Sequence, residues 1–213
     1  MKVGIIGSGA VGQTLAKAFK NEGYEVMIGT RNPSKQKIVD FNNETKIDIG
    51  TFDETAKFGE LLVLTVKGAA AKEALQLAGE ENVKDKVIID TTNPIANTPP
   101  VNGVLNFTTS FQTSLMEELQ QQAPTAKFVK AFNSVGNTQM YKPTLKEIPT
   151  MFICGNDDEA KKTVTDILTN FGWETADMGK AEAARAIEPL AILWCIPGFL
   201  QNSWSHAFKL LRS

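Results

Sequence analysis

The chain is poor in the side chains that most often supply acid–base catalysis, metal ligands or crosslinks. Its 213 residues include one histidine, His206, and two cysteines, Cys154 and Cys195. Two cysteines give no disulfide framework and are typical of buried free thiols in a reducing compartment. No metal-ligand spacing, nucleophile elbow or P-loop is present. We therefore predict no metal and no catalytic acid, base or nucleophile, and we interpret His206 as packed or exposed.

Charge and long apolar runs are also limited. The net charge is −2, with 22 basic and 24 acidic residues, so no overall positive field attracts nucleic acid. The most apolar segment, residues 189–196, is followed by Pro197, Gly198 and polar residues, which predicts that it does not span a membrane. A strand pattern begins within two residues of the N-terminus and leaves no room for a signal peptide. We expect a cytoplasmic protein with neither nucleic-acid nor membrane partners.

The most informative motif is a glycine-rich turn after a short apolar run. Gly7, Gly9 and Gly12 have the spacing G-x-G-x-x-G, and apolar residues recur at helical spacing after them. The first glycine permits a tight turn, the second lets a pyrophosphate approach the backbone, and the third lets helix and strand pack closely. The motif predicts a dinucleotide whose phosphates lie on a helix N-terminus. Its candidate contacts are Gly7, Ser8, Gly9, Ala10, Val11 and Gly12.

A second predicted strand, at residues 25–29, ends in residues that favour a 2′-phosphate. An NAD site usually has an acidic residue there, because a carboxylate binds the ribose 2′-hydroxyl. This chain has Thr30 and Arg31 instead, followed by Lys35. A carboxylate repels a phosphate, whereas a guanidinium can bind it with two hydrogen bonds. The sequence therefore predicts that the chain binds NADP. The alternative is that Arg31 and Lys35 are solvated surface charges. The cofactor-binding candidates here are Thr30, Arg31, Asn32 and Lys35.

Strand and helix patterns alternate along most of the chain. Further strands are predicted at residues 61–66, 86–90, 128–133, 149–154 and 173–177. The alternation implies parallel pairing with right-handed crossovers. We expect a Rossmann-type α/β fold, doubly wound and mainly parallel, with a small C-terminal helical portion. The predicted units are an NADP-binding domain at residues 1–178 and a helical segment at residues 179–213.

Local signals predict several helix boundaries. Thr51 and Glu54 predict a capping box, Asn32 is expected to cap a helix that ends near residue 42, and Asn156 is expected to cap a helix over residues 157–170. Phe111 is expected to share the apolar stripe of the helix that follows it. From residue 180 to 212 we expect two helices divided near Pro197.

Polar residues follow several predicted strands at one edge of the sheet. A dinucleotide crosses the carboxyl ends of such strands, so these positions are candidates for contact with the nicotinamide. They are Thr65, Val66, Lys67, Asn93, Pro94, Ala131, Phe132 and Asn133. Plain turns are the alternative interpretation, and Lys67 can equally be a surface cation. The proline-rich connection at residues 96–106 is expected to face the substrate.

The apolar stripe of the C-terminal helices has three interpretations. It can pack on the sheet of its own chain, form a wall of the substrate pocket, or form a dimer interface, because large apolar patches usually mark binding surfaces. These interpretations do not exclude one another.

Several of these segments resemble a known family. Four segments are similar to the NADPH-dependent coenzyme F420 reductases. They are the glycine turn, Thr30 and Arg31 with Lys35, residues 129–133 and, above all, residues 152–162. The same segments are similar to the cytoplasmic oxidoreductase domain of the STEAP metalloreductases. The resemblance implies a Rossmann domain with a helical C-terminal portion, often dimeric, that binds NADP and passes a hydride to a flavin or deazaflavin.

By position, the resemblance implies 2′-phosphate contacts at Thr30, Arg31 and Lys35 and nicotinamide-side contacts at the strand ends. One departure concerns the acceptor, because the archaeal deazaflavin reductases carry a histidine where this chain has Asn133. Direct hydride transfer between two bound molecules depends on the alignment of donor and acceptor more than on a catalytic acid or base. This requirement is consistent with a chain that has few candidate acids and bases.

Two alternative functions use the same nucleotide site. One is an NADPH-binding redox sensor without turnover. The other is an NADPH-dependent imine or hydroxy-acid reductase. A hydroxy-acid dehydrogenase would need a lysine and an asparagine one turn apart in the helix after the sheet, where this chain has Arg185 and Glu188.

Overall fold

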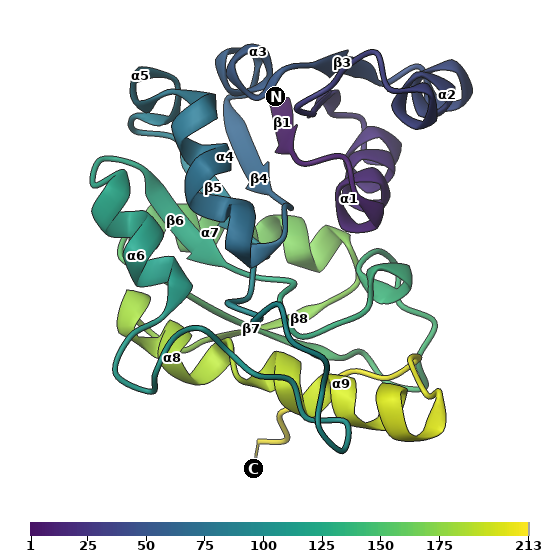
Figure 1. Ribbon diagram of the computed structural model, residues 1–213, viewed down its shortest axis with the longest axis vertical. Coiled ribbons are helices and arrows are strands. Elements are labelled where there is room, and N and C mark those ends of the chain that lie inside the picture. Colours follow the sequence, from purple (N-terminus) through teal and green to yellow (C-terminus); the bar gives the residue numbers. More distant parts are fainter. Residues whose placement is uncertain (213) are drawn as a thin grey trace.

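One eight-stranded sheet organises the chain, with the strand order β3-β2-β1-β4-β5-β6-β7-β8 (Figure 1). The computed structural model describes residues 1–212. The strands are β1 (Lys2–Ile6), β2 (Glu25–Gly29), β3 (Asp48–Gly50), β4 (Leu61–Leu64), β5 (Val87–Asp90), β6 (Lys127–Lys130), β7 (Thr150–Gly155) and β8 (Glu174–Asp177). All neighbouring strands are parallel except β6 and β7. The chain winds outward from β1 to β3 and returns to β4, so the carboxyl ends of β1 and β4 form the switch point where such sheets bind nucleotides.

Helices cover both faces of the sheet (Figure 1). They are α1 (Ala10–Asn21), α2 (Gln36–Thr45), α3 (Phe52–Phe58), α4 (Ala71–Ala78), α5 (Glu80–Val83), α6 (Leu115–Gln122), α7 (Asp158–Asn170), α8 (Ala184–Ile187) and α9 (Leu190–Gln201). Buried strand residues alternate between two cores. Ile5 and Val63 pack with α1 and α7, whereas Ile6 and Leu62 pack with α4, α6 and α8. This is the doubly wound α/β fold that the sequence predicts.

The start of α2 differs from the prediction. Asn32 does not cap this helix, because its side chain accepts hydrogen bonds from the backbone N–H and the hydroxyl of Ser34, at 3.1 and 2.8 Å. These bonds form a local turn, and α2 begins only at Gln36. The residues between β2 and α2 therefore remain an exposed loop. The capping box of Thr51 and Glu54 at the start of α3 is confirmed.

Two further boundaries are corrected. Asp157, rather than Asn156, caps α7 by accepting a hydrogen bond from Ala160, while the Asn156 side chain accepts one from the N–H of Ala181. Asn156 thus joins the end of β7 to the C-terminal helices. Phe111 lies outside α6 and is 86% exposed, because Ser114 caps that helix.

The expected division near Pro197 is wrong. α9 continues through Pro197 as far as Gln201, and the helical hydrogen-bond pattern is interrupted instead at Glu188 and Pro189, between α8 and α9, where the backbone keeps helical dihedral angles. Pro197 deprives the carbonyl of Leu193 of its helical donor, but Leu193 is 55% exposed, so water can satisfy that carbonyl. Pro189 precedes the first turn of α9, where a missing N–H costs no helical hydrogen bond.

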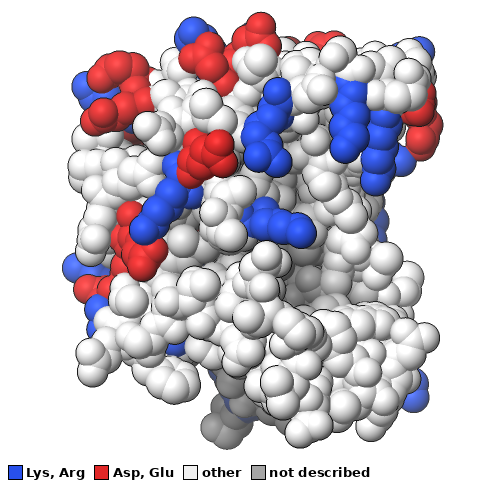
Figure 2. Space-filling model, in the orientation of Figure 1, with Lys and Arg blue, Asp and Glu red and all other residues white. Residues whose placement is uncertain are grey.

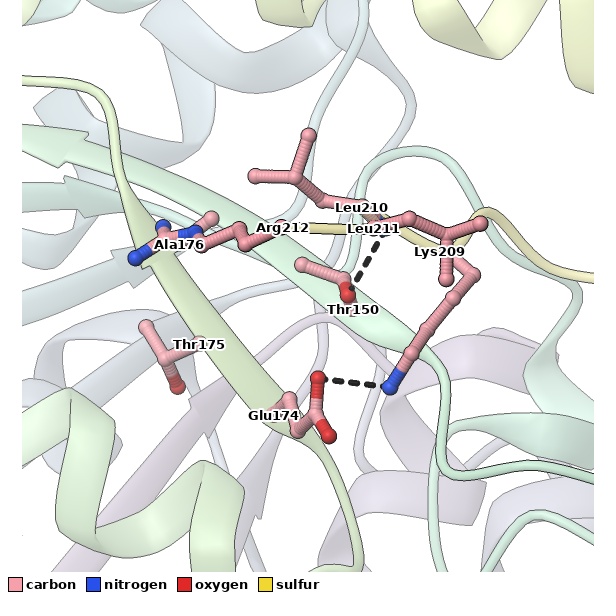
Figure 3. Close-up of a pocket in the computed structure, with 8 residues that line it drawn as sticks. All are labelled: Thr150, Glu174, Thr175, Ala176, Lys209, Leu210, Leu211 and Arg212. Atoms are coloured by element: carbon pink, nitrogen blue, oxygen red, sulfur yellow. Dashed lines mark hydrogen bonds and ion pairs between the residues drawn. The ribbon is translucent and has the colours of Figure 1, made fainter.

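The residues after α9 form an extended tail that lies on the sheet. Figure 3 shows this tail beside β7 and β8, where the N–H of Leu210 donates to the hydroxyl of Thr150 at 3.1 Å and Lys209 pairs with Glu174 at 2.7 Å. The N–H of Thr150 also donates to the carbonyl of Phe208. The tail therefore fixes the C-terminal portion to the far edge of the sheet.

One helical run within residues 1–212 is long and apolar enough to cross a membrane, judged by length and composition alone. It is Ala181–Gln201, with 21 residues and a mean hydropathy of 1.4 in its most apolar window, a third of which is buried. This run is longer than the apolar segment at residues 189–196, because it begins at Ala181 and continues through Pro197. The core helix of a soluble protein passes the same test.

Candidate functional site

A cavity at the carboxyl ends of β1, β2 and β4 brings together most of the predicted cofactor residues. Its volume is about 390 Å³, and it is lined by Gly7, Ser8, Gly9, Thr30, Arg31, Asn32, Lys35, Phe52, Thr65, Val66, Lys67, Ala70, Glu73 and Ala74. Ten of these residues are among the sequence candidates. The other four, Phe52, Ala70, Glu73 and Ala74, were not among those candidates, although Phe52 directly follows the capping residue of α3. Such a capping signal after a strand marks a helix that starts at the same edge.

The glycine turn leaves room for a ligand at the start of α1. Gly7 has a φ of +128°, and a side chain at Gly12 would place its Cβ 1.9 Å from the carbonyl oxygen of Gly7. A Cβ on Gly9 would meet no atom within 4 Å. Gly9 caps α1 without a side-chain hydrogen bond, so the first N–H groups of this 12-residue helix remain available to an anion. The turn therefore fits a pyrophosphate.

Thr65 holds this turn in place from the neighbouring strand. It is 7% exposed, and its hydroxyl lies 3.0 Å from the carbonyl oxygen of Gly7 and 3.2 Å from that of Ile6. Its hydroxyl donates to these oxygens and thereby links the end of β4 to the turn after β1. In this arrangement Thr65 orients the backbone of the turn.

The cavity is lined by three basic residues that form no ion pair within residues 1–212, and by one acidic residue, Glu73. Arg31 and Lys35 are exposed, and neither they nor Lys67 form an ion pair with any of residues 1–212. Figure 2 shows basic side chains gathered on the upper part of this face, above the hollow at its centre. Thr30 is fixed by the sheet, because its N–H donates to the carbonyl of Gly50. The end of β2 therefore presents a hydroxyl and two free cations.

A pair of asparagines joins the ends of β5 and β6. The Asn93 amide donates to the carbonyl of Asn133 at 2.7 Å, and the Asn133 amide donates to the side chain of Asn93 at 3.2 Å and to the carbonyl of Ile187 at 2.9 Å. The Oδ1 atom of Asn133 is buried and has no partner among residues 1–212. This pair connects both strand ends to α8, and neither asparagine lines the nucleotide cavity.

Other predicted residues at these strand ends face away from the nucleotide cavity. Ala131 and Phe132 are 0% and 1% exposed and belong to the core that includes α1 and α7. Phe132 has a φ of +61°, a conformation that a phenylalanine rarely adopts, and its N–H donates to the sulfur of Met151. The carbonyl of Pro94 accepts a hydrogen bond from Thr108 and anchors the following loop. These residues shape the backbone that carries Asn93 and Asn133.

A buried charge cluster lies behind the asparagine pair. The ammonium of Lys130 is 2.6 Å from Asp90 and 2.8 Å from Glu188, and it donates to the carbonyl of Thr92 at 2.8 Å. Asp90 accepts hydrogen bonds from the N–H and hydroxyl of Thr92, directly before Asn93. Glu188 accepts the N–H groups of the first two residues of α6. We call Lys130, Asp90 and Glu188 the buried triad.

The triad determines the protonation of its lysine. Burial lowers the pKa of Lys130, but the carboxylates of Asp90 and Glu188 outweigh burial and raise that pKa above its ordinary value. The nearby Cys154 behaves differently, since burial raises the pKa of its thiol to about 12. Cys154 is therefore a neutral thiol at physiological pH.

The remaining polar candidates do not add a catalytic group. The ring of His206 stacks on Trp194, with centroids 5.0 Å apart, and its Nε2 lies 2.9 Å from the carbonyl oxygen of Trp194. Among the described residues no group of three His, Cys, Asp or Glu side chains could hold a metal ion. Arg185 is bound by Glu117, so the position after the sheet lacks the free lysine of a hydroxy-acid dehydrogenase.

Comparisons with known proteins point to one group. Residues 2–94 match the family described as NADP oxidoreductase coenzyme F420-dependent. The chain is 28% identical to Metalloreductase STEAP3 of Rattus norvegicus over 204 residues, which cover 93% of this chain and 39% of that protein. It is 27% identical to an F420-dependent NADP reductase of Methanocaldococcus jannaschii over 205 residues, which cover 91% of this chain and 90% of that protein.

A solved structure shows the same relationship. The crystal structure of a candidate F420-dependent NADP reductase from Arthrobacter sp. FB24 is similar to the whole chain, with a TM-score of 0.92 and 29% identity, and the match covers 100% of both chains. These comparisons confirm the predicted fold and the predicted resemblance to a family of NADP-dependent oxidoreductases.

Proposed function

We propose that this chain, as a relative of the coenzyme F420-dependent NADP oxidoreductases, transfers a hydride between NADPH and a flavin-like or deazaflavin acceptor. The observation that carries the proposal is the cavity at the switch point, where an uncapped helix N-terminus faces Arg31 and Lys35. The chain spans 39% of the length of the metalloreductase it matches. The activity is therefore proposed from the residues of this chain.

In this proposal the cavity binds the adenosine half of the nucleotide. The N–H groups at the start of α1 bind the pyrophosphate, and Gly9 gives it access to the backbone. Arg31 and Lys35 bind the 2′-phosphate, with Thr30 and Asn32 beside them. The support is that both cations are free of protein carboxylates and line one cavity with the glycine turn. A carboxylate at either position would repel the phosphate instead.

At the other end of the nucleotide, the asparagine pair holds the nicotinamide. The unpartnered Oδ1 of Asn133 accepts a hydrogen bond from the nicotinamide carboxamide, which satisfies an otherwise costly buried acceptor. Thr65, Val66 and Lys67 shape the space between the two ends of the nucleotide. When bound, NADPH supplies a hydride, which is one proton with two electrons, and becomes NADP⁺. The reduced acceptor takes its second proton from water, so no acid or base from the chain is required.

Three broader proposals accompany this function. The division at residue 178 is functional, with residues 1–178 binding NADP and residues 179–213 forming a wall of the acceptor site.

The exposed apolar side chains of α9, including Leu193 and Phe199, contact a second copy of the chain, which light scattering tests directly. A cytoplasmic location suits Cys154 and Cys195, neither of which forms a disulfide within residues 1–212.

Anaerobic stopped-flow absorbance tests the proposed reaction. NADPH is mixed with the protein and with a free flavin or deazaflavin, and we expect NADPH oxidation and acceptor reduction in equal amounts. Calorimetry with NADPH in the absence of acceptor verifies that the nucleotide site is intact. Tight NADPH binding without reduction of either acceptor contradicts the proposal. Turnover only with an imine would favour the imine reductase alternative.

A further inference from the structure

The side of the molecule next to the asparagine pair carries almost no charge. Residues 91–116 contain no Asp, Glu, Lys or Arg, and neither do residues 189–208, although the whole chain has 22 basic and 24 acidic residues. Figure 2 shows this contrast, since charged side chains crowd the upper part of the face and its lower front is largely white. The connection from β5 to α6 and helix α9 lie in that lower part in Figure 1.

These two uncharged segments adjoin the proposed nicotinamide end. The first begins just before Asn93, and the second follows Ile187, whose carbonyl accepts the hydrogen bond from Asn133. Glu188 then ties the two segments together through the N–H groups at the start of α6. An acceptor that approaches the nicotinamide from this side therefore meets residues of both segments.

A small apolar cavity lies between the two segments. Its volume is about 140 Å³, and its apolar lining includes Phe107, Phe111, Pro189 and Ile192. An engineered apolar cavity of about 150 Å³ holds one benzene molecule, so this cavity suits one six-membered ring. Phe111 is 86% exposed at its edge, which leaves an aromatic surface for a planar molecule to cover.

The charged residues of this cavity are already paired. Arg185 donates to both carboxylate oxygens of Glu117, at 2.9 and 3.1 Å from its Nε. Glu188 is 2.8 Å from the ammonium of Lys130. In the buried triad two carboxyl groups face a single ammonium, so the triad has no positive charge to spare. Among the described residues that line this cavity, none offers a free cation to an anionic ligand.

We propose that the acceptor is an uncharged planar aromatic molecule, such as a flavin without a phosphate or a quinone, which inserts one ring into this cavity. A phosphate group would lose hydration at a largely apolar wall whose one cation, Arg185, is already bound by Glu117, and that loss disfavours its binding. This inference rests on the proposed function and specifies its acceptor. By this inference, the chain differs from an enzyme that recognises its acceptor through an anionic tail on the acceptor.

Riboflavin and FMN provide a matched pair of probes, because they share one ring system and differ by one phosphate. The dissociation constant of each is measured by quenching of flavin fluorescence on the complex of the protein with NADP⁺. The same pair is then compared by kcat/KM with NADPH, with menadione as an uncharged quinone. We expect riboflavin to bind at least about tenfold more tightly than FMN, because the phosphate is desolvated without compensation.

Two lysine substitutions test the role of charge. Ser110→Lys adds a cation at an exposed position on the cavity edge, and it should strengthen FMN binding while leaving riboflavin binding nearly unchanged. Leu77→Lys adds the same charge to the exposed face of α4, which lines neither this cavity nor the nucleotide cavity, and it should not alter the ratio.

The outcomes separate this inference from the proposed function. Equal or tighter binding of FMN than of riboflavin by the unmodified protein overturns the inference, while FMN reduction would leave the proposed function intact. NADPH binding with no binding or reduction of riboflavin, FMN or menadione overturns both. A preference for riboflavin that Ser110→Lys abolishes and Leu77→Lys preserves supports the inference.

Discussion

Arg31 and Lys35 line the nucleotide cavity, and neither has an acidic partner among residues 1–212. Lys17, Lys57 and Lys72, by comparison, each lie 2.8 Å from a carboxylate. A free guanidinium beside a helix N-terminus suits a phosphate, because planar bidentate contact and the helix dipole act in the same direction. At this scale a single residue is expected to determine the choice between the two nicotinamide nucleotides.

Replacement of Arg31 tests that choice. We expect Arg31→Asp to weaken NADPH binding by about tenfold or more, the scale of a charge-assisted hydrogen bond, and to change NADH binding far less. Calorimetry with each nucleotide measures the difference. Lys37→Asp makes the same change of charge on an exposed residue of α2 outside the cavity and should spare both nucleotides. Equal losses for NADPH and NADH would show that Arg31 does not contact the phosphate.

The unit formed by β1, the glycine turn and α1 is the element on which the nucleotide site depends. Gly12 and Gly9 have different roles in it, since Gly12 has the Gly7 carbonyl against it and Gly9 faces open space. The turn itself is fixed by Thr65 from β4. Packing of the helix on the strand and access for a pyrophosphate are therefore separable properties of one short segment.

Two alanine substitutions should separate these properties. Gly12→Ala is expected to destabilise the fold by about 1–3 kcal/mol, because its Cβ overlaps the Gly7 carbonyl. Gly9→Ala should change stability by less than about 1 kcal/mol yet weaken NADP⁺ binding strongly, since the methyl group occupies the space of the pyrophosphate. Urea unfolding without nucleotide and calorimetry with NADP⁺ measure the two effects. Unchanged NADP⁺ affinity in Gly9→Ala would contradict the proposed position of the phosphates.

The buried triad connects the C-terminal helices to the sheet at the scale of the whole molecule. Lys130 comes from β6, Asp90 from β5 and Glu188 from the junction between α8 and α9. The tail adds a second connection through Thr150 and Lys209 (Figure 3). Residues 181–187 also share a core with β4, β5 and α6. The proposed acceptor wall is thus held by contacts that span more than half of the chain.

Removal of the triad's lysine should be costly. Lys130→Met leaves two buried carboxyl groups without their cation, and we expect a loss of about 3–5 kcal/mol in the free energy of unfolding. Lys72→Met, which removes an exposed partner of Glu118, should cost less than about 1 kcal/mol. Urea unfolding followed by tryptophan fluorescence compares the two. Similar losses in both variants would show that the triad contributes no more than a surface ion pair.

The contribution of Lys130 to the free energy of unfolding should also depend on pH. The pKa of Lys130 is raised in the folded protein above the ordinary value of 10.5, because Asp90 and Glu188 outweigh burial. Its contribution to stability is therefore complete below pH 10.5 and is lost as the pH rises through the higher folded value. The difference in stability between the unmodified protein and Lys130→Met should be constant below that pH and decrease above it.

Much of the fold could be predicted because its signals are local. The spacing of Gly7, Gly9 and Gly12 predicts a turn from the permitted backbone angles of glycine, and the capping box of Thr51 and Glu54 depends on residues three apart. Asn32 and Asn156 show the limit of such signals. As a helix cap, each side chain would accept a hydrogen bond from an N–H in the first turn of the helix. Asn32 instead accepts one from Ser34 and Asn156 one from Ala181, because several N–H groups compete for the same side-chain oxygen.

The sequence by itself determined the alternation of strands and helices, apart from the short strand β3, together with the dinucleotide turn and the absence of a carboxylate after β2. These depend on neighbours along the chain, whose geometry the backbone limits to a few states. Only the tertiary structure decided the antiparallel pairing of β7, the continuation of α9 through Pro197, the buried triad and the asparagine pair. Asn93 and Asn133 are 40 residues apart, and they meet because β5 and β6 are adjacent. Contacts of that kind depend on how separate elements pack, which no local pattern specifies.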